Sequence, residues 1–364
     1  MKILIMTGKF GMGHWSASQS LRLQLLSSFP DAEVTVEDFF SYAMPDLSEA
    51  MYKGFSLLVT RGGGLYNLYY KATENVATKM RPPLEDFLLG RFAQLLSERE
   101  ADMVIATHPS CAQVVSAYKE DTGSALPLVT CITDLSSHSE WINEGTDCYL
   151  VGFPEIRNQL AEKGVDPQRI LVTGIPVKPE FKASARRGGE QERRLLIMGG
   201  GLGLLPKKDS FYGDLNGLTG VKTTLITGGN QKLYERLFGK YENIEVLGFT
   251  DRVYDYMGQA DLILSKPGGI TLFESIFSEL PILAWEPFLQ QERNNAQFIV
   301  RYQLGRIAAK EPEACVDAIQ KLIYDEDALS RMSENMRRLK GQLEVRSLEH
   351  MLTLLSVETK EVCA

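Results

Sequence analysis

The first half of the chain alternates between short apolar runs and longer segments with helical spacing. Residues 2–7 form an apolar run that leads through a glycine loop into an amphipathic segment at 14–29, which predicts a strand and then a helix. Further strands are predicted at 33–37, 102–107, 127–133 and 147–152. Because helical segments separate most of these strands, the pattern predicts an α/β fold with a parallel, doubly wound sheet.

The alternation stops near residue 174 and then starts again. Residues 174–179 contain two prolines and a glycine, and a polar, basic stretch follows them, which is typical of a linker between domains. The second series of strands is predicted at 195–198, 222–227, 244–247, 261–265 and 281–285. Residues 312–357 are rich in helix formers and predict two or three helices, the last of which returns to the first domain. The predicted boundaries are 1–178 with about 343–364 for the first domain, 179–192 for the linker and 193–342 for the second domain.

Size and charge narrow the class of protein. The 364 residues suffice for two domains with complete cores. The net charge of −8 argues against nucleic acid as a partner. The sequence has no run of about 18 apolar residues that would predict a transmembrane helix, and its first seven residues are too short for a signal-peptide core.

The cysteines also point to a reduced compartment. They are five in number, scattered, and form no Cys-x-x-Cys pair, which argues against a disulfide scaffold or a zinc knuckle. We therefore expect a cytoplasmic protein in which Cys111 and Cys131 are buried small residues rather than nucleophiles. The acidic triplet at 325–327 resembles a metal site, but its position between predicted surface helices favours a solvated turn, and we expect no metal.

A basic island interrupts the acidic sequence between residues 51 and 81. This segment contains one acidic residue, Glu74, and five basic residues, which are Lys53, Arg61, Lys71, Lys79 and Arg81. Such an island can bind an anionic membrane surface, and it can equally be the solvated face of a helix.

The most informative motif is the glycine loop at 266–269. It joins the predicted strand at 261–265 to a predicted helix at 270–280, and the N-terminus of such a helix presents unpaired N–H groups that suit a phosphate. Glu274 lies about one turn into this helix, where its carboxylate can reach a ribose hydroxyl. A second loop, 198–203, has four glycines in five positions, which allows the backbone to approach a ligand closely.

The first glycine loop, residues 8–14, supports two interpretations. Gly11 and Gly13 match the start of a dinucleotide fingerprint, with Asp38 as the ribose acid, but Ser16 stands where the fingerprint needs glycine or alanine. Alternatively, His14 at the start of the helix is a general base for an attacking hydroxyl. A structural or capping histidine stays open beside these two.

Polar residues follow several other predicted strands. Gln291, Glu292 and Asn295 offer amide and carboxylate groups for sugar hydroxyls, or cap a helix instead. His108 and Asp134 follow two strands of the first domain, and ligands gather at the carboxyl ends of parallel strands. Each of these two residues can also cap the helix after it.

The order of these motifs resembles that of one enzyme family. The shared motifs are Gly11-x-Gly13-His14-x-x-Ala17, Thr107-His108-Pro109, Thr133-Asp134 with His138 and Trp141, Gly174-Ile175-Pro176, Lys266-Pro267-Gly268-Gly269-x-Thr271-x-x-Glu274 and Gln291-Glu292-x-x-Asn295-Ala296. In this order they are similar to the monogalactosyldiacylglycerol synthases and processive diacylglycerol glucosyltransferases of glycosyltransferase family 28. The resemblance implies the GT-B fold, in which two Rossmann-like domains face each other across a cleft.

The resemblance also implies roles for individual residues. His14 is the implied catalytic base, and no metal cofactor is implied. The implied donor-binding residues are Gly200, Gly201, Gly203, Phe249 beside the uracil, Gly268, Gly269, Ile270, Thr271, Glu274, Gln291, Glu292 and Asn295. The implied acceptor-side residues are Gly13, His108, Asp134 and His138.

The expected activity is therefore inverting transfer of a hexose from a UDP-sugar to diacylglycerol or a glycosyldiacylglycerol. The expected location is peripheral, on the inner face of the cell membrane, where aromatic and apolar residues at 52–70 can enter the interface or else form a core or a lid. Three alternatives stay open: a transferase for a soluble acceptor, a UDP-sugar epimerase, and a nucleotide-binding module without catalysis.

Overall fold

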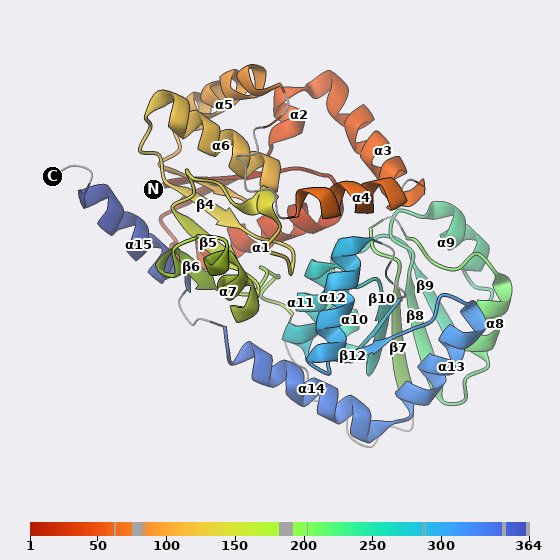
Figure 1. The fold of residues 1–364 in the computed structure, drawn as a ribbon. Helices are drawn as coiled ribbons and strands as arrows, with labels where there is room; N and C mark the ends of the chain where they lie inside the picture. Colours follow the sequence, from red (N-terminus) through yellow and green to blue (C-terminus); the bar gives the residue numbers. More distant parts are fainter. Residues whose placement is uncertain are drawn as a thin grey trace. The chain divides into compact units, whose positions relative to one another are not determined.

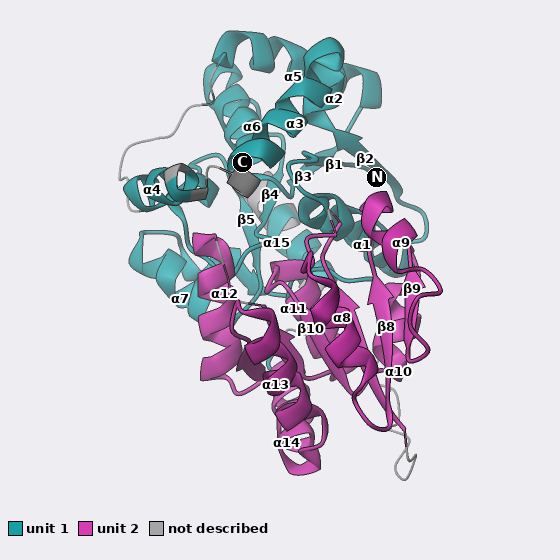
Figure 2. Cartoon of the chain, turned by 90° about the vertical axis from the view of Figure 1, so that its right-hand side faces the viewer, with its two compact units in different colours: residues 1–179, 342–364 teal, residues 180–341 magenta. Residues whose placement is uncertain are grey.

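Two six-stranded parallel sheets organise the residues that the structure describes (Figure 1). The computed structural model describes residues 1–61, 63–74, 82, 84–181, 192–201, 203–285, 287, 289–343 and 347–361. The chain divides into two units, which are residues 1–179 with 342–364, and residues 180–341 (Figure 2). Most of the linker predicted at 179–192 lies outside the described residues, as do Cys363 and two residues of the basic island, Lys79 and Arg81.

The first unit contains the sheet with strand order β2-β1-β3-β4-β5-β6. Its strands are β1 (Lys2–Thr7), β2 (Glu33–Asp38), β3 (Met103–Ala106), β4 (Leu128–Cys131), β5 (Cys148–Val151) and β6 (Ile170–Val172). Its helices are α1 (Met12–Ser28), α2 (Phe39–Ala43), α3 (Pro45–Arg61), α4 (Gly63–Thr73), α5 (Glu85–Arg99), α6 (Pro109–Thr122), α7 (Pro154–Glu162) and α15 (Ser347–Glu361), with 3₁₀ turns at Ser139–Trp141 and Pro167–Arg169.

Residues of β1 alternate between two cores, one on each face of this sheet. Ile3 and Ile5 pack with Leu21 of α1 and Met351 of α15. Leu4 and Met6 pack on the other face with residues of α2, α5 and α6. Because both faces are buried, residues 3–6 of this strand are all apolar, which is why the sequence shows an uninterrupted run there.

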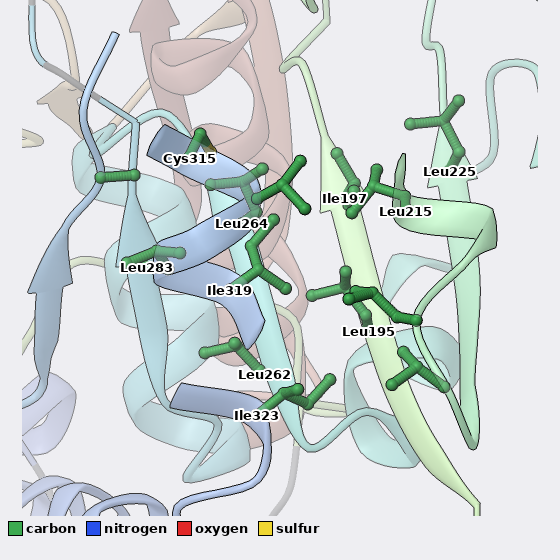
Figure 3. Close-up of a cluster of buried hydrophobic side chains, with 14 of the residues drawn as sticks. Leu195, Ile197, Leu215, Leu225, Leu262, Leu264, Leu283, Cys315, Ile319 and Ile323 are labelled. Atoms are coloured by element: carbon green, nitrogen blue, oxygen red, sulfur yellow. The ribbon is translucent and has the colours of Figure 1, made fainter. Parts of the chain in front are cut away.

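The second unit contains the sheet with strand order β12-β11-β10-β7-β8-β9. Its strands are β7 (Arg193–Met198), β8 (Val221–Ile226), β9 (Ile244–Leu247), β10 (Leu262–Ser265), β11 (Ile282–Ala284) and β12 (Gly305–Ile307). Its helices are α8 (Asp209–Asn216), α9 (Gln231–Leu237), α10 (Val253–Gln259), α11 (Gly269–Ser278), α12 (Gln290–Arg301), α13 (Pro312–Ile323) and α14 (Glu326–Lys340). Leu195 of β7 and Leu264 of β10 share a core with Ile319 of α13 (Figure 3).

The predicted fold class is confirmed, and the differences from prediction are local. The sequence pattern missed β6 and β12, which have three residues each and are too short to show a period. The strand predicted at 127–133 ends at Cys131, because residues from Thr133 onward form a loop with side-chain contacts of its own. The helix-rich tail contains α13, α14 and α15, and α15 belongs to the first unit.

Candidate functional site

In the first unit, the predicted site residues follow the carboxyl ends of neighbouring strands, from which the chain continues to opposite faces of the sheet. After β1 the chain enters α1, which packs on one face, and after β3 it enters α6, which packs on the other. β1 and β3 are adjacent in the sheet. A parallel sheet with this reversal has an open crevice at the carboxyl ends of those two strands, where ligands bind.

His14 lies in the first turn of α1, directly after the loop that follows β1. Its ring nitrogen Nδ1 is 2.9 Å from the carbonyl oxygen of Thr107, at the end of β3, and 2.8 Å from Oγ1 of Thr133, in the loop after β4. A carbonyl oxygen can only accept, so Nδ1 carries the proton that bonds Thr107. The neutral ring then has its lone pair on Nε2, which is the state a general base needs.

The surroundings of His14 keep its imidazole neutral. Burial lowers the pKa of His14 below 6.5, while the charge of Asp134 and the bond to Thr107 act in the opposite direction. Burial likewise raises the pKa of Asp134 above 3.8, and the neighbouring His14 and His138 counteract that rise. The His14 ring also meets the ring of His108 edge to face, with centroids 4.9 Å apart.

The two other predicted histidines act as caps in this structure. Nδ1 of His108 accepts a hydrogen bond from the backbone N–H of Ser110 at the start of α6, at 3.2 Å. Nδ1 of His138 accepts from the N–H of Glu140 at 3.3 Å. Burial and the nearby His14 hold the pKa of His108 well below 6.5. His108 therefore caps the helix that follows it, which was one of the two alternatives from the sequence. Gly13 precedes His14 in the first turn of α1.

Helix α4 is tied to the loop that carries Thr133 and Asp134. The hydroxyl of Tyr70 lies 2.8 Å from that of Ser136, and the carbonyl oxygen of Tyr70 lies 3.0 Å from Nε2 of His138. On the same helix, Tyr69 donates a hydrogen bond to Glu140 at 2.6 Å. These contacts had no signal in the sequence, since no local pattern links residues more than 60 positions apart.

The segment that was expected to meet a membrane divides into inner and outer residues. Tyr70 is only 3% exposed, so it is a core residue. Phe55 and Tyr66 pack against each other, and Phe10 of the first glycine loop packs on Phe55 and Tyr52. The outer residues of the segment are exposed and largely apolar, and they are Leu57, Leu58, Leu68 and Tyr69. The side chains of Arg61 and Leu65 lie outside the described residues.

In the second unit, the two glycine loops also follow adjacent strands. β7 and β10 are hydrogen-bonded neighbours, and the chain leaves them for α8 and α11, which lie on opposite sides of the sheet (Figure 1). The loops 199–203 and 266–268 therefore meet the same rule for a ligand crevice as the first unit.

The loop after β7 depends on glycine for packing as well as for access. Gly203 has φ +59°, and a Cβ there would lie 2.0 Å from the carbonyl oxygen of Thr227. Its own carbonyl accepts a hydrogen bond from the Asn230 side chain at 2.9 Å. Gly200 and Gly201 are exposed, so the backbone of the loop is accessible at these two positions.

The loop after β10 opens α11 without a side-chain cap. Gly268 is the N-cap residue, and Gly269, Ile270 and Thr271 form the first turn, so the positive end of the helix dipole is presented to a ligand by backbone groups. Glu274 follows in the second turn, with an intermediate exposure.

Two residues of α12 hold this loop in place. Asn295, which is buried, donates its side-chain amide to the carbonyl of Pro267 at 2.8 Å. Glu292 lies 3.4 Å from Nζ of Lys266. Gln291 precedes Glu292 in the first turn of α12. Phe249, after β9, is 72% exposed. The Lys266–Glu292 pair had no sequence signal.

Several other expectations concern the cysteines, the acidic triplet, a metal site and a membrane-spanning helix. The described cysteines, Cys111, Cys131, Cys148 and Cys315, are buried, and burial raises the pKa of Cys131 to about 12. Asp325 caps α14 by accepting from the N–H of Ala328. Within the described ranges, no three His, Cys, Asp or Glu side chains are placed to hold a metal ion. No helix in the described part of the chain combines the length and hydropathy that a membrane crossing requires.

Comparison with known proteins places both halves of the chain in one enzyme class. Residues 14–177 match the family model of monogalactosyldiacylglycerol synthase, and residues 208–349 match the glycosyltransferase family 28 C-terminal domain. The chain is 29% identical to the processive diacylglycerol beta-glucosyltransferase of Bacillus subtilis, over 93% of this chain and 91% of that protein. It is 28% identical to the Staphylococcus carnosus enzyme of the same name, over 93% and 89%.

The fold agrees with these matches. The structure superposes on that of MurG from Acinetobacter baumannii with a TM-score of 0.61 and 14% identity, covering 98% of this chain and 99% of that one. The predicted GT-B architecture is therefore confirmed.

Proposed function

We propose that this chain, which belongs to glycosyltransferase family 28, transfers a hexose from a UDP-sugar to a hydroxyl of diacylglycerol or of a glycosyldiacylglycerol. The observation that carries the chemistry is the imidazole of His14, which is held through Nδ1 at the crevice beside β1. The names of the similar enzymes support a diacylglycerol acceptor.

In the proposed reaction the acceptor oxygen attacks the anomeric carbon from the face opposite the leaving group. The new carbon–oxygen bond forms as the bond to the diphosphate breaks, so the configuration inverts and UDP leaves with the bonding electron pair. Nε2 of His14 takes the proton of the attacking hydroxyl. A neutral ring at pH 7, which the lowered pKa of His14 provides, is required for this step.

The second unit would bind the donor. Backbone N–H groups at the start of α11 and at Gly200 and Gly201 suit the diphosphate, because they need no reorganisation as its negative charge grows. Glu274 would accept from the ribose, Phe249 would cover the uracil, and Gln291 with Glu292 would bind the hexose. Asn295 would act through the loop, since its amide holds Pro267.

We further propose that α3 and α4 bring the protein to an anionic bilayer as a peripheral protein. The exposed Leu57, Leu58, Leu68 and Tyr69 offer apolar area, and the exposed Lys53 and Lys71 offer positive charge. Lys53 is paired with Glu49 at 2.6 Å.

One experiment tests the reaction and its alternatives together. The protein is incubated with vesicles that contain diacylglycerol and, in separate reactions, UDP-glucose, UDP-galactose or UDP-N-acetylglucosamine, and products are identified by mass. Glycosyldiacylglycerol supports the proposal. Conversion of the donor without an acceptor would indicate an epimerase, and UDP binding without UDP release would indicate a binding module.

Membrane binding is tested separately by co-sedimentation with vesicles with and without anionic lipid. Leu68→Ser is the informative variant, because Leu68 is 66% exposed and its loss should not unfold the unit. Reduced sedimentation in that variant supports the surface. If the natural protein does not bind vesicles, and it and Leu68→Ser are equally active toward a soluble acceptor, a soluble substrate would be favoured.

A further inference from the structure

The His14 imidazole is held by two oxygens at one nitrogen. Nδ1 lies 2.9 Å from the Thr107 carbonyl oxygen and 2.8 Å from Thr133 Oγ1. These two residues come from the ends of adjacent strands β3 and β4. One of the oxygens belongs to the backbone and cannot be changed by substitution, whereas the other is a side-chain hydroxyl.

The two oxygens cannot have equal roles. Nδ1 has a single proton, and the Thr107 carbonyl needs that proton for its hydrogen bond. Thr133 therefore serves as a second acceptor of the same N–H. When Nε2 takes a proton, the ring becomes a cation, and hydrogen bonds from a charged donor are about twice as strong as neutral ones. The Thr133 oxygen thus stabilises the protonated ring more than the neutral one.

We propose that Thr133 is a positioning residue, whose hydroxyl helps to fix the plane of the His14 ring and stabilises the imidazolium that forms during transfer. The inference rests on the proposed role of His14 as the base. It adds a residue whose contribution is exerted through Nδ1 of His14.

Other titratable groups face the same ring and must be considered in any pH experiment. Asp134 follows Thr133 in the loop, and His108 approaches from the start of α6. The groups that act in turn on Asp134 or are affected by it are His138, Glu140, Tyr66 and Tyr70. Replacing Thr133 changes none of these charges, so a shift in the titration of His14 reports the lost hydroxyl.

The test uses two substitutions at position 133 and a matched control. Thr133→Val removes the hydroxyl and keeps the shape, and Thr133→Ser keeps the hydroxyl. The control is Thr130→Val in β4, because Thr130 is also buried and its hydroxyl bonds a threonine, Thr146 at 2.8 Å, away from His14.

We expect Thr133→Val to lower kcat about 10-fold, the size of effect for one charge-assisted hydrogen bond. Since the imidazolium loses an acceptor, the pKa of His14 falls, and the acidic limb of the pH profile of kcat/KM moves to lower pH. Thr133→Ser should restore both kcat and the limb. Thr130→Val should leave both unchanged, whatever it does to the unfolding temperature.

A second measurement needs no substrate. Nitrogen-15 spectra of histidine-labelled protein, with the His14 signals identified by their absence in His14→Gln, should show a protonated Nδ1 in the natural protein. Thr133→Val should lower the pKa read from these signals, and Thr130→Val should not.

The outcomes separate this proposal from the function on which it rests. If the natural protein glycosylates no lipid but the His14 titration shifts as described, the proposed function fails and the contact of Thr133 stands. An unshifted titration in Thr133→Val, or equal losses of kcat in Thr133→Val and Thr133→Ser, would overturn the positioning role.

Discussion

Replacing Gly203 with alanine should destabilise the second unit more than replacing Gly200 in the same loop. Gly203 has φ +59°, and an added Cβ would lie 2.0 Å from the Thr227 carbonyl oxygen and 2.6 Å from Cβ of Asn230. Backbone atoms and a side chain that itself bonds Gly203 cannot simply rotate away. The loop would have to move away from residues 227–230.

The cost can be worked out from these contacts. A non-glycine residue in the left-handed region costs about 1–2 kcal/mol. Displacing packed neighbours adds about 1–3 kcal/mol. Together these give about 2–5 kcal/mol, and for a unit of this size each kcal/mol lowers Tm by roughly 2–4 °C. Gly203→Ala should therefore lower Tm by roughly 4–20 °C.

Substitutions at two further glycines separate the cost of the left-handed backbone from the cost of displacing packed neighbours. Gly200 has φ +67° and would bring no atom within 4 Å of an added Cβ, so Gly200→Ala has the conformational cost alone, about 1–2 kcal/mol. Gly213 lies inside α8 with open space around it, and Gly213→Ala should stabilise by about 0.5–1 kcal/mol.

Differential scanning calorimetry measures the three variants, and added UDP identifies the transition that a bound nucleotide stabilises. Titration calorimetry then gives UDP affinity, which should fall for Gly203→Ala and stay normal for Gly213→Ala. A Gly203→Ala protein that is no less stable than Gly200→Ala would refute the argument from the Thr227 carbonyl.

Three other variants test the proposed site. His14→Ala should lower kcat by roughly 10²–10⁴-fold with UDP affinity unchanged, because it removes a general base, and near-normal turnover would remove His14 from that role. Glu274→Ala should weaken UDP binding by about 10-fold or more in titration calorimetry, since a charged acceptor of a ribose hydrogen bond is lost; equal affinity would contradict the ribose assignment. The acidic limb of kcat/KM should lie below pH 6.5, because activity requires neutral His14 and its pKa is lowered. Asp134→Asn should move that limb to still lower pH, because Asp134 raises the His14 pKa; a limb that stays or rises would contradict this electrostatic account.

The fold was predictable from the sequence because parallel strands buried on both faces leave an uninterrupted apolar run. β10, with all four residues buried, shows this clearly. β12 escaped prediction because only Gly305 of its three residues is buried, while Arg306 and Ile307 are exposed at the edge of the sheet. Such a strand is defined by its pairing with β11 and not by its composition.

The candidate site was predictable by residue type but not by contact. His14 could be chosen because a histidine after a strand and a glycine loop is suited to proton transfer. Its partners, Thr107 and Thr133, are 93 and 119 positions away, and they reach it only because β3 and β4 follow β1 in the sheet. For Asn295 the residue type was misleading about the contact. An asparagine there suggests a sugar ligand, but its side-chain amide donates a hydrogen bond to the carbonyl of Pro267.

The two crevices follow one topological rule but offer different chemistry. In the first unit, side chains carry the chemistry, because a threonine hydroxyl and a carboxylate act on one imidazole. In the second unit, the loops after β7 and β10 are built from glycine and an uncapped helix start, so backbone groups dominate. A side chain can exchange a proton, and a backbone N–H can only donate a hydrogen bond. Substitutions in the first unit should therefore change kcat and its pH dependence, whereas those in the second should change the affinity for the nucleotide.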